Sequence, residues 1–162
     1  MKIRDFRKSD FPTVKSIYQQ GIDTGNATFQ LKAKEWDEWN KYFLNSCRIV
    51  AELNGVVIGW AALSAVSKRF VYSGVAEVSL YVSSVHSGKG TGYLLLSELV
   101  NKSEQEGIWT LQAGVFPENQ ASINIHLKND FKKLGIREKL GKMNGLWRDI
   151  LLMERRSKVI GV

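Results

Sequence analysis

The chain has 162 residues, of which 44% are hydrophobic and 24% charged, values typical of one globular domain over residues 1–162. No apolar stretch approaches the roughly 20 residues that a membrane span needs, the N-terminus lacks a secretory signal, and the lone Cys47 excludes an internal disulfide, so a cytoplasmic protein is expected. The net charge of +7 suits an anionic ligand, but acidic residues interrupt most basic clusters, so neither a membrane nor a nucleic acid is an expected partner.

The N-terminal third is predicted to form a short strand and two helices. The strand covers residues 2–6, and the first helix covers residues 9–22, with Ser9 as its N-cap and apolar residues at helical spacing. A loop over residues 25–30 precedes a second helix at residues 33–46. One side of this helix carries aromatic residues, which predicts packing: Trp36, Trp39, Tyr42 and Phe43.

The middle of the chain is predicted to be strand-rich. Two apolar runs, residues 47–53 and 56–64, flank an Asn-Gly pair, which is the strongest short signal for a β-hairpin. A further strand covers residues 74–82, and a long helix covers residues 92–107, closed by Gly107.

The C-terminal part alternates again between strand and helix. We expect a strand at residues 108–116, a helix at residues 117–131 entered at Pro117, and a late strand at residues 147–156. The whole order is β-α-α-β-β-β-α-β-α-β-β, in which one of the last two strands is not assigned to particular residues, and it predicts an α/β (α+β) fold with a mixed central sheet and helices on both faces.

The glycine cluster HSGKGTG, residues 86–92, lies between a predicted strand and a predicted helix. It fails the P-loop pattern because Gly90 follows Lys89, and it fails the dinucleotide pattern because Tyr93 stands where a third glycine belongs. Glycines nevertheless let a ligand approach the backbone, and the helix N-terminus after them attracts anions. By itself the cluster is equally compatible with a plain strand-to-helix connection.

The order strand, G-x-G-x-G loop, helix, strand and ENQASINIH resembles the acyl-CoA-binding half of GCN5-related N-acetyltransferases. Segments from residue 21 to residue 157 further resemble the phosphinothricin and methionine sulfoximine acetyltransferase-like branch: GIDTGNATF, VIGWAALS, VYSGVAEVSLYV, GIWTLQAGVFPENQASINIH and WRDILLMERRS. The resemblance implies an acyl-CoA N-acyltransferase fold whose central strands splay apart, and acetyl-CoA as co-substrate. It also implies a homodimer that acetylates small amino acids such as phosphinothricin, methionine sulfoximine or methionine sulfone.

The resemblance assigns the coenzyme to the glycine loop and to the strand before it. The loop residues whose backbone would hold the pyrophosphate are Ser87, Gly88, Lys89, Gly90, Thr91 and Gly92. Ser87 stands where the family usually has Gln or Arg, so we expect weaker binding rather than lost function. Backbone groups near Leu80, Tyr81 and Val82 would bond the pantetheine arm, and Asn119 would also contact acetyl-CoA.

Two residues could carry the proton transfers of acetyl transfer. Glu77 is a carboxylate within an apolar strand, where alternation puts it on the face opposite Val78 and Leu80, and such a group suits a general base. From the pattern alone an exposed face or a salt bridge explains it as well; the resemblance implies the catalytic role. The same holds for His126, which the resemblance implies in catalysis and which could otherwise be a hydrogen-bonded core histidine.

The resemblance places the amine substrate against two stretches. Phe29 and Tyr72 would wall the substrate side chain, and Arg69 could pair with a carboxylate or phosphinate, in a stretch that also contains Phe70 and Val71. Two histidines and one cysteine predict no metal cluster.

Two alternatives remain open from the sequence. The first is an acetyltransferase for another amine, such as a peptide N-terminus or an antibiotic. The second is a non-catalytic acyl-CoA-binding or basic nucleic-acid-binding module.

Overall fold

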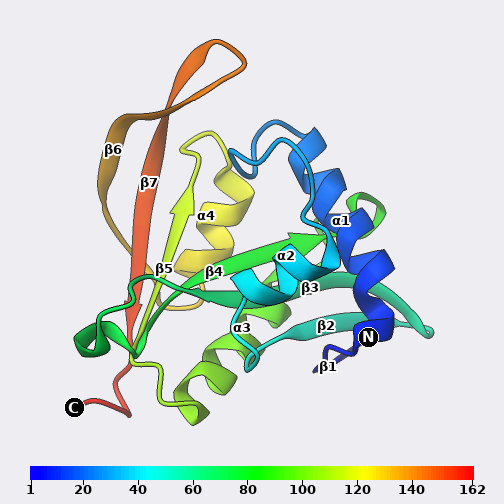
Figure 1. The fold of residues 1–162 in the computed structure, drawn as a ribbon, viewed down its shortest axis with the longest axis horizontal. Helices are drawn as coiled ribbons and strands as arrows, with labels where there is room; N and C mark the ends of the chain where they lie inside the picture. Colours follow the sequence, from blue (N-terminus) through cyan, green and yellow to red (C-terminus); the bar gives the residue numbers. More distant parts are fainter.

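The computed structural model describes residues 1–162 and is organised around one seven-stranded sheet (Figure 1). Only β4 and β5 run parallel; every other neighbouring pair is antiparallel. Across the sheet the strands are β1 (Lys2–Asp5), β2 (Ile49–Leu53), β3 (Val56–Ala65), β4 (Val75–Val82), β5 (Thr110–Val115), β7 (Leu146–Arg156) and β6 (Lys132–Met143). The predicted mixed sheet and the predicted order of elements along the chain are confirmed.

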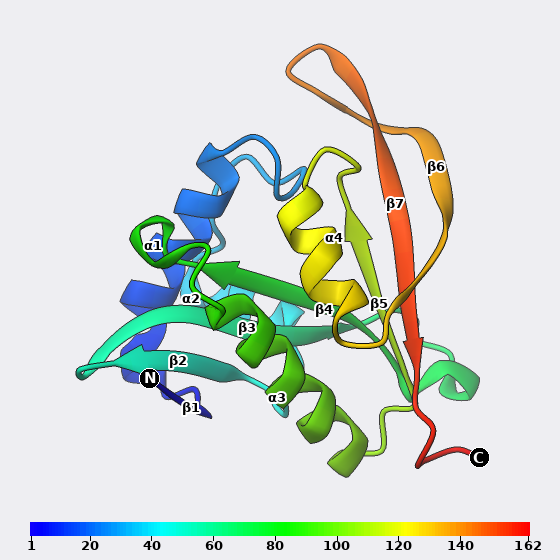
Figure 2. The same ribbon diagram turned by 180° about the vertical axis from the view of Figure 1, so that it is seen from behind.

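Helices cover both faces of the sheet, as predicted (Figures 1 and 2). α1 (Phe11–Asp23) and α2 (Trp36–Tyr42) lie on one face, and α3 (Thr91–Gln105) and α4 (Gln120–Leu127) lie on the other. Short 3-10 turns occupy η1 (Lys8–Asp10), η2 (Phe70–Tyr72) and η3 (Ser84–His86). None of the helices combines the length and the apolar character that crossing a membrane requires.

Each face of the sheet has its own hydrophobic core. On the α3 and α4 face the core is mostly aliphatic, and Val78, Leu80 and Val82 of β4 pack against it. On the α1 and α2 face it is rich in aromatic rings, including the buried Trp39 and Trp60. The alternation predicted for residues 74–82 is therefore confirmed.

Several predicted helix boundaries were wrong, including the start of α2, which is Trp36 rather than residue 33, and the end of α4, which is Leu127 rather than residue 131. Ser9 does not cap α1; it lies in the η1 turn, where the Asp10 carboxylate accepts the Arg7 N–H at 2.7 Å and pairs with Arg4. α2 ends at Tyr42 because Phe43 adopts an extended backbone and buries its ring under the sheet. α4 begins only at Gln120, after the Asn119 side chain accepts the Ser122 N–H at 3.2 Å.

The hairpin prediction was right in detail. Asn54 and Gly55 both have positive φ, 50° and 78°, as a two-residue type I′ connection requires. β2 begins at Ile49 rather than at Cys47, whose φ of 60° keeps it out of the strand.

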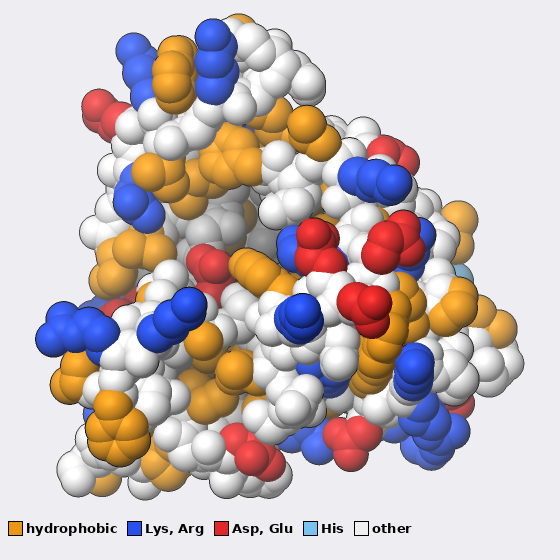
Figure 3. Space-filling view, in the orientation of Figure 1, with side chains coloured by type: hydrophobic (Ala, Val, Ile, Leu, Met, Phe, Trp, Pro, Cys, Tyr) orange, Lys and Arg blue, Asp and Glu red, His pale blue; other side chains and the backbone are white.

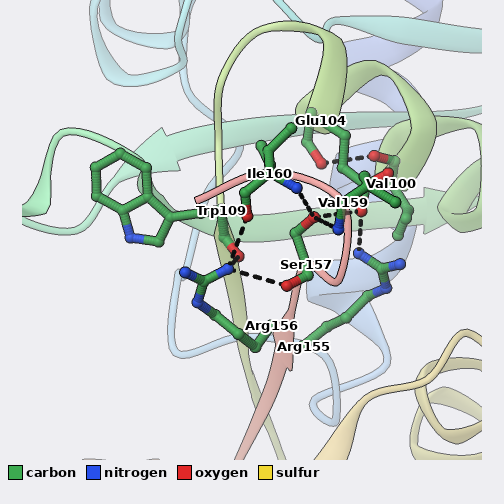
Figure 4. A network of polar contacts seen from close by, with 9 residues as sticks. Val100, Glu104, Trp109, Arg155, Arg156, Ser157, Val159 and Ile160 are labelled. Carbon is green, nitrogen blue, oxygen red and sulfur yellow. Dashed lines mark hydrogen bonds and ion pairs between the residues drawn. The ribbon is translucent and has the colours of Figure 1, made fainter. Parts of the chain in front are cut away.

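A polar network fixes the C-terminal end of β7 beside α3 (Figure 4). The Glu104 carboxylate on α3 accepts hydrogen bonds from Arg155 at 3.0 Å and from the Ser157 hydroxyl at 2.8 Å. Arg156 donates to the backbone carbonyls of Trp109 and Ser157. The end of β7 is thus tied to α3 and to the segment that enters β5, which holds β5 and β7 firmly together at this end of the sheet.

Candidate active site

The sheet opens in its middle, between β4 and β5. These strands pair only from Val75 to Glu77, opposite residues 110–112, and then diverge (Figure 1). β4 stays paired with β3 as far as Val82, while β5 stays paired with β7 as far as Val115. The second half of β4 therefore has one side without a partner strand.

Alternation shows which groups of β4 face this opening. The Ser83 N–H donates to the Ile58 carbonyl on β3 at 2.8 Å, so the backbone groups of Tyr81 also point to β3. Those of Leu80 and Val82 point to the gap. Of the three residues predicted to bond the pantetheine arm, Tyr81 thus offers its side chain and not its backbone.

A cavity of about 840 Å³ occupies the opening. Figure 3 shows the hollow from the α1 and α2 side, between these helices and the β5–β7 edge. Its lining includes most of the predicted site residues: Phe29, Glu77, Leu80, Tyr81, Val82, Ser87, Gly88, Gly90, Thr91, Gly92, Asn119 and His126. The fold therefore brings β4, the glycine loop, α4 and the loop that contains Phe29 together around one cavity.

The glycine loop lines the cavity and has the features of an anion-binding loop. Gly88 and Gly90 have φ of 74° and 85°, a region that favours glycine. The backbone N–H groups from Gly88 through Tyr93 make no hydrogen bond within the protein, and the first to do so is that of Leu94, with Gly90. A run of free N–H groups at a helix N-terminus attracts negative charge.

Gly92 has a different role from the other two glycines. A Cβ at this position would lie 2.9 Å from Ile125 Cδ1, so the absence of a side chain lets α3 and α4 pack closely. Gly88 and Gly90 by contrast have open space where a Cβ would stand. Ser87 is exposed beside them, and Lys89 does not line the cavity.

These features fit a coenzyme that has a pyrophosphate and an arm containing amide groups. The loop offers N–H donors for the phosphates, and the free backbone groups of Leu80 and Val82 offer both donors and acceptors for the amides. Both elements line the same cavity, so one extended molecule can use them together. The residues present therefore fit acetyl-CoA.

Glu77 lies where the strands begin to separate. It is the last residue of β4 that pairs with β5, it is half-buried, and its side chain lies on the α1 and α2 face. The carboxylate makes no hydrogen bond or ion pair with the protein; Gly114 of β5 has no side chain, and a Cβ there would lie 3.9 Å from Glu77 Oε1. A carboxylate without a protein partner is free to accept a proton from a ligand.

His126 lies on α4, on the other face, and is 3% exposed. Its Nδ1–H donates to the Ser122 carbonyl at 2.7 Å, and its Nε2 is buried without a partner. Burial lowers the pKa of the ring below its usual range, and the Ser122 carbonyl opposes this only in part. The ring is therefore neutral at pH 7, with the lone pair on Nε2.

The predicted substrate residues do not all meet. Phe29 lies in the cavity wall with its ring 5.0 Å from that of Phe116. Residues 69–72 lie in the β3–β4 connection, away from the cavity lining, with Phe70 91% exposed. Arg69 there stacks over Tyr72.

Several other cavity residues were not predicted to belong to the site. Lys34 is buried and lies over the ring of Tyr42, and Tyr18 of α1 lies beside it. Lys34 falls within the predicted helix 33–46, but α2 begins only at Trp36, and the burial of this lysine follows from the position of its segment against α1. No group of three or more His, Cys, Asp and Glu side chains that could hold a metal ion is present.

A sheet that opens beside a glycine-rich loop with free N–H groups, with an unpaired carboxylate at the opening, fits the class of enzymes that take an acyl group from coenzyme A. The sequence profile of the acetyltransferase (GNAT) family matches residues 7–131, and the chain belongs to this family. It is therefore an acyltransferase.

Named relatives are similar over nearly the whole chain. The phosphinothricin N-acetyltransferase of Alcaligenes faecalis is 30% identical, over 94% of this chain and 81% of that protein. The L-methionine sulfoximine/L-methionine sulfone acetyltransferase of Salmonella typhimurium is 29% identical, over 95% and 93%. A crystal structure of a GNAT superfamily phosphinothricin acetyltransferase from Sinorhizobium meliloti in complex with acetyl-CoA superposes with a TM-score of 0.84 and 27% identity, over 99% of this chain and 95% of that one. The acetyl-CoA in that relative supports acetyl-CoA as the co-substrate here.

Proposed function

We propose that the protein moves the acetyl group of acetyl-CoA to the amino group of a small amino acid of the phosphinothricin, methionine sulfoximine or methionine sulfone type. The observation that carries this proposal is the Glu77 carboxylate, which has no partner and stands at the point where β4 and β5 separate. The names of relatives that are 29–30% identical support the substrate class.

The coenzyme, when bound, supplies an acetyl thioester. Backbone N–H groups of residues 88–93 would hold its pyrophosphate, with Ser87 and Lys89 at the edge of the loop. Leu80 and Val82 would align its arm through their backbone, and the Tyr81 ring would line the amine side. Asn119 already caps α4 and donates to the Asn26 carbonyl at 3.1 Å, so its contact with the coenzyme would add to a structural role.

Glu77 prepares the amine. An α-amino group with a pKa of about 8 or higher is mostly protonated at pH 7 and cannot attack a carbonyl carbon in that form. The free carboxylate accepts the ammonium proton, directly or through one water molecule, and the neutral amine then attacks the thioester without an acyl-enzyme.

His126 handles a second proton. The neutral ring carries its hydrogen on Nδ1, so Nε2 has no proton to donate and must first accept one. We assign to it a relay role, in which Nε2 takes up a proton in the cavity and passes it to the departing thiolate. Its burial keeps bulk water from competing for that nitrogen.

The amine substrate would contact Phe29 in the cavity wall. Residues 69–72, with Arg69, Phe70, Val71 and Tyr72, remain part of the proposed substrate site, although they do not line the cavity of a single chain. Their exposure, together with that of Leu146 and Trp147, favours a homodimer in which these apolar side chains are covered. Light scattering coupled to gel filtration tests this, and a monomer would contradict it.

The test of the proposed function is Glu77→Gln. General-base removal should lower kcat about 10²- to 10⁴-fold while the affinity for acetyl-CoA is unchanged. Thiol release from acetyl-CoA measures the rate with methionine sulfone, and calorimetry measures the affinity. Glu106→Gln, an exposed acid at the end of α3, is the matched control. Unchanged turnover in Glu77→Gln would remove Glu77 from the mechanism; wild-type activity on no amine would refute the proposed function.

A further inference from the structure

One buried lysine in the cavity has no part in the mechanism above. Lys34, in the segment between α1 and α2, is 7% exposed and lines the same cavity as Glu77. Lysine is among the residues least often buried, because its ammonium loses hydration. A buried lysine in a binding cavity needs a physical reason.

The protein gives Lys34 no carboxylate partner. Its Nζ donates to the Tyr18 hydroxyl oxygen at 3.3 Å and lies 4.4 Å from the centre of the Tyr42 ring. Neither contact neutralises its charge, and Glu38, the acid that most affects it, makes no ion pair with it. Burial accordingly lowers the pKa of Lys34. The positive charge of Lys34 therefore has no counter-ion within the protein, and an anionic ligand could supply one.

The backbone around Lys34 is fixed in advance. The Ala33 N–H donates to Gln19 Oε1 on α1 at 2.9 Å, and the Glu35 carboxylate pairs with Lys15 on α1 at 2.6 Å. The residues on both sides of Lys34 are thus attached to the same helix. A side chain held in this way loses little freedom when it binds a ligand.

The position of Lys34 favours the amine substrate over the coenzyme. Tyr18, which contacts Lys34, packs against the Tyr81 ring at 4.8 Å on the α1 and α2 face, where Glu77 also lies. The glycine loop leads into α3, which covers the other face. Lys34 and Glu77 line the same cavity and do not contact each other, so Lys34 would bind a part of the substrate other than the amine held at Glu77.

We propose that Lys34 binds the distal anionic group, a phosphinate or side-chain carboxylate, of the amino acid that is acetylated. The Tyr18 hydroxyl, whose pKa burial raises to about 12, keeps its proton and can donate to the same anion. Lys34 is then a specificity-determining residue, which selects amines with a second negative charge over neutral ones. This inference rests on the proposed N-acetyltransferase function.

The experiment compares wild type, Lys34→Met and Lys41→Met. Lys41 is an exposed lysine of α2 whose side chain makes no hydrogen bond or ion pair, so it controls for the loss of one charge. Each purified protein is assayed by thiol release with phosphinothricin, whose distal group is anionic, and with methionine sulfone, whose distal group is neutral. Lys34→Met should raise KM for phosphinothricin about ten- to hundredfold and leave KM for methionine sulfone and acetyl-CoA unchanged.

Other outcomes overturn the inference. An equal change with both amines, or a change in the KM for acetyl-CoA, would show that Lys34 serves packing or the coenzyme. If Lys34→Met does not fold, Lys34→Gln and competition of wild type by L-glutamate against L-glutamine replace it, and equal competition refutes selection by charge. Wild-type transfer to some amines with unchanged selectivity in the variant refutes only the role of Lys34. Transfer to no amine refutes the proposed function and this inference together.

Discussion

Gly90→Ala tests whether the loop before α3 is an anion cradle. Gly90 has φ of 85°, a backbone conformation that costs an L-residue about 1–2 kcal/mol. No atom stands within 4 Å of the added Cβ, so strain is the only cost in the folded state. If the loop keeps its shape, stability falls by that amount, about 2–8 °C in Tm for a domain of this size. If it relaxes, the N–H groups of residues 88–93 turn away from their ligand.

The assay separates these two results. Calorimetry with acetyl-CoA and thermal unfolding are measured for Gly90→Ala and for Gly55→Ala. Gly55 has φ of 78° and equally open surroundings, but it lies in the β2–β3 turn, outside the cavity lining. Both variants should lose similar stability or relax, and only Gly90→Ala should bind acetyl-CoA more weakly. Each 1.4 kcal/mol of binding free energy lost because the N–H groups no longer point at the ligand corresponds to a factor of ten in Kd. A loss of Tm smaller than the strain predicts would indicate that the Gly90 loop has relaxed. If Gly90→Ala then binds acetyl-CoA with the same Kd as wild type, the loop is not an anion cradle.

Three further changes have defined outcomes. Ser87→Arg should lower KM for acetyl-CoA several-fold, because a charge-assisted hydrogen bond to phosphate contributes about 1 kcal/mol more than a neutral one; a raised KM in steady-state kinetics would count against the loop geometry. Burial lowers the pKa of His126, so as the pH falls this histidine is protonated in the unfolded chain before it is protonated in the folded protein. The free energy of unfolding should therefore decrease below about pH 6.5, by at most about 1.4 kcal/mol per pH unit. Urea titrations should show a smaller decrease in His126→Gln. Gly141→Ala should raise KM for the amine at almost constant Tm, because the new Cβ meets the far end of the Phe29 ring at 2.8 Å; an unchanged KM would mean that this ring is not in the substrate wall.

The order of elements was predictable because each has a strong local pattern. The Asn54-Gly55 turn and the alternation along β4 are decided by nearest neighbours, and both were confirmed. Helix ends depend on the rest of the chain instead. Phe43 leaves α2 because its ring gains burial among aromatic residues from β3 and α2, a gain that no local pattern reveals.

The site was predictable to the extent that its residues lie in regular elements. The positions of Glu77, His126 and the glycine loop follow from β4, α4 and the start of α3, and all of them line one cavity. Their roles remain predictions. Lys34 was not found, because a lysine in a polar segment carries no sign of burial until α1 is placed beside it. The segment 69–72 was expected beside the substrate, and in a single chain it is not among the residues that line the cavity.

The separation of β4 from β5 also divides the sheet mechanically. Strands β1 to β4 and strands β5 to β7 form two half-sheets, which pair with each other only along the short stretch Gly74–Glu77. Each half ends in an edge strand inside the molecule. A ligand that forms hydrogen bonds with this edge connects the two half-sheets while it is bound. At a concentration of 100 times its Kd it adds about 2.7 kcal/mol to the free energy of unfolding. Release of coenzyme A at the end of each catalytic cycle would then remove this connection, so the sheet would be more rigid with the coenzyme bound than without it.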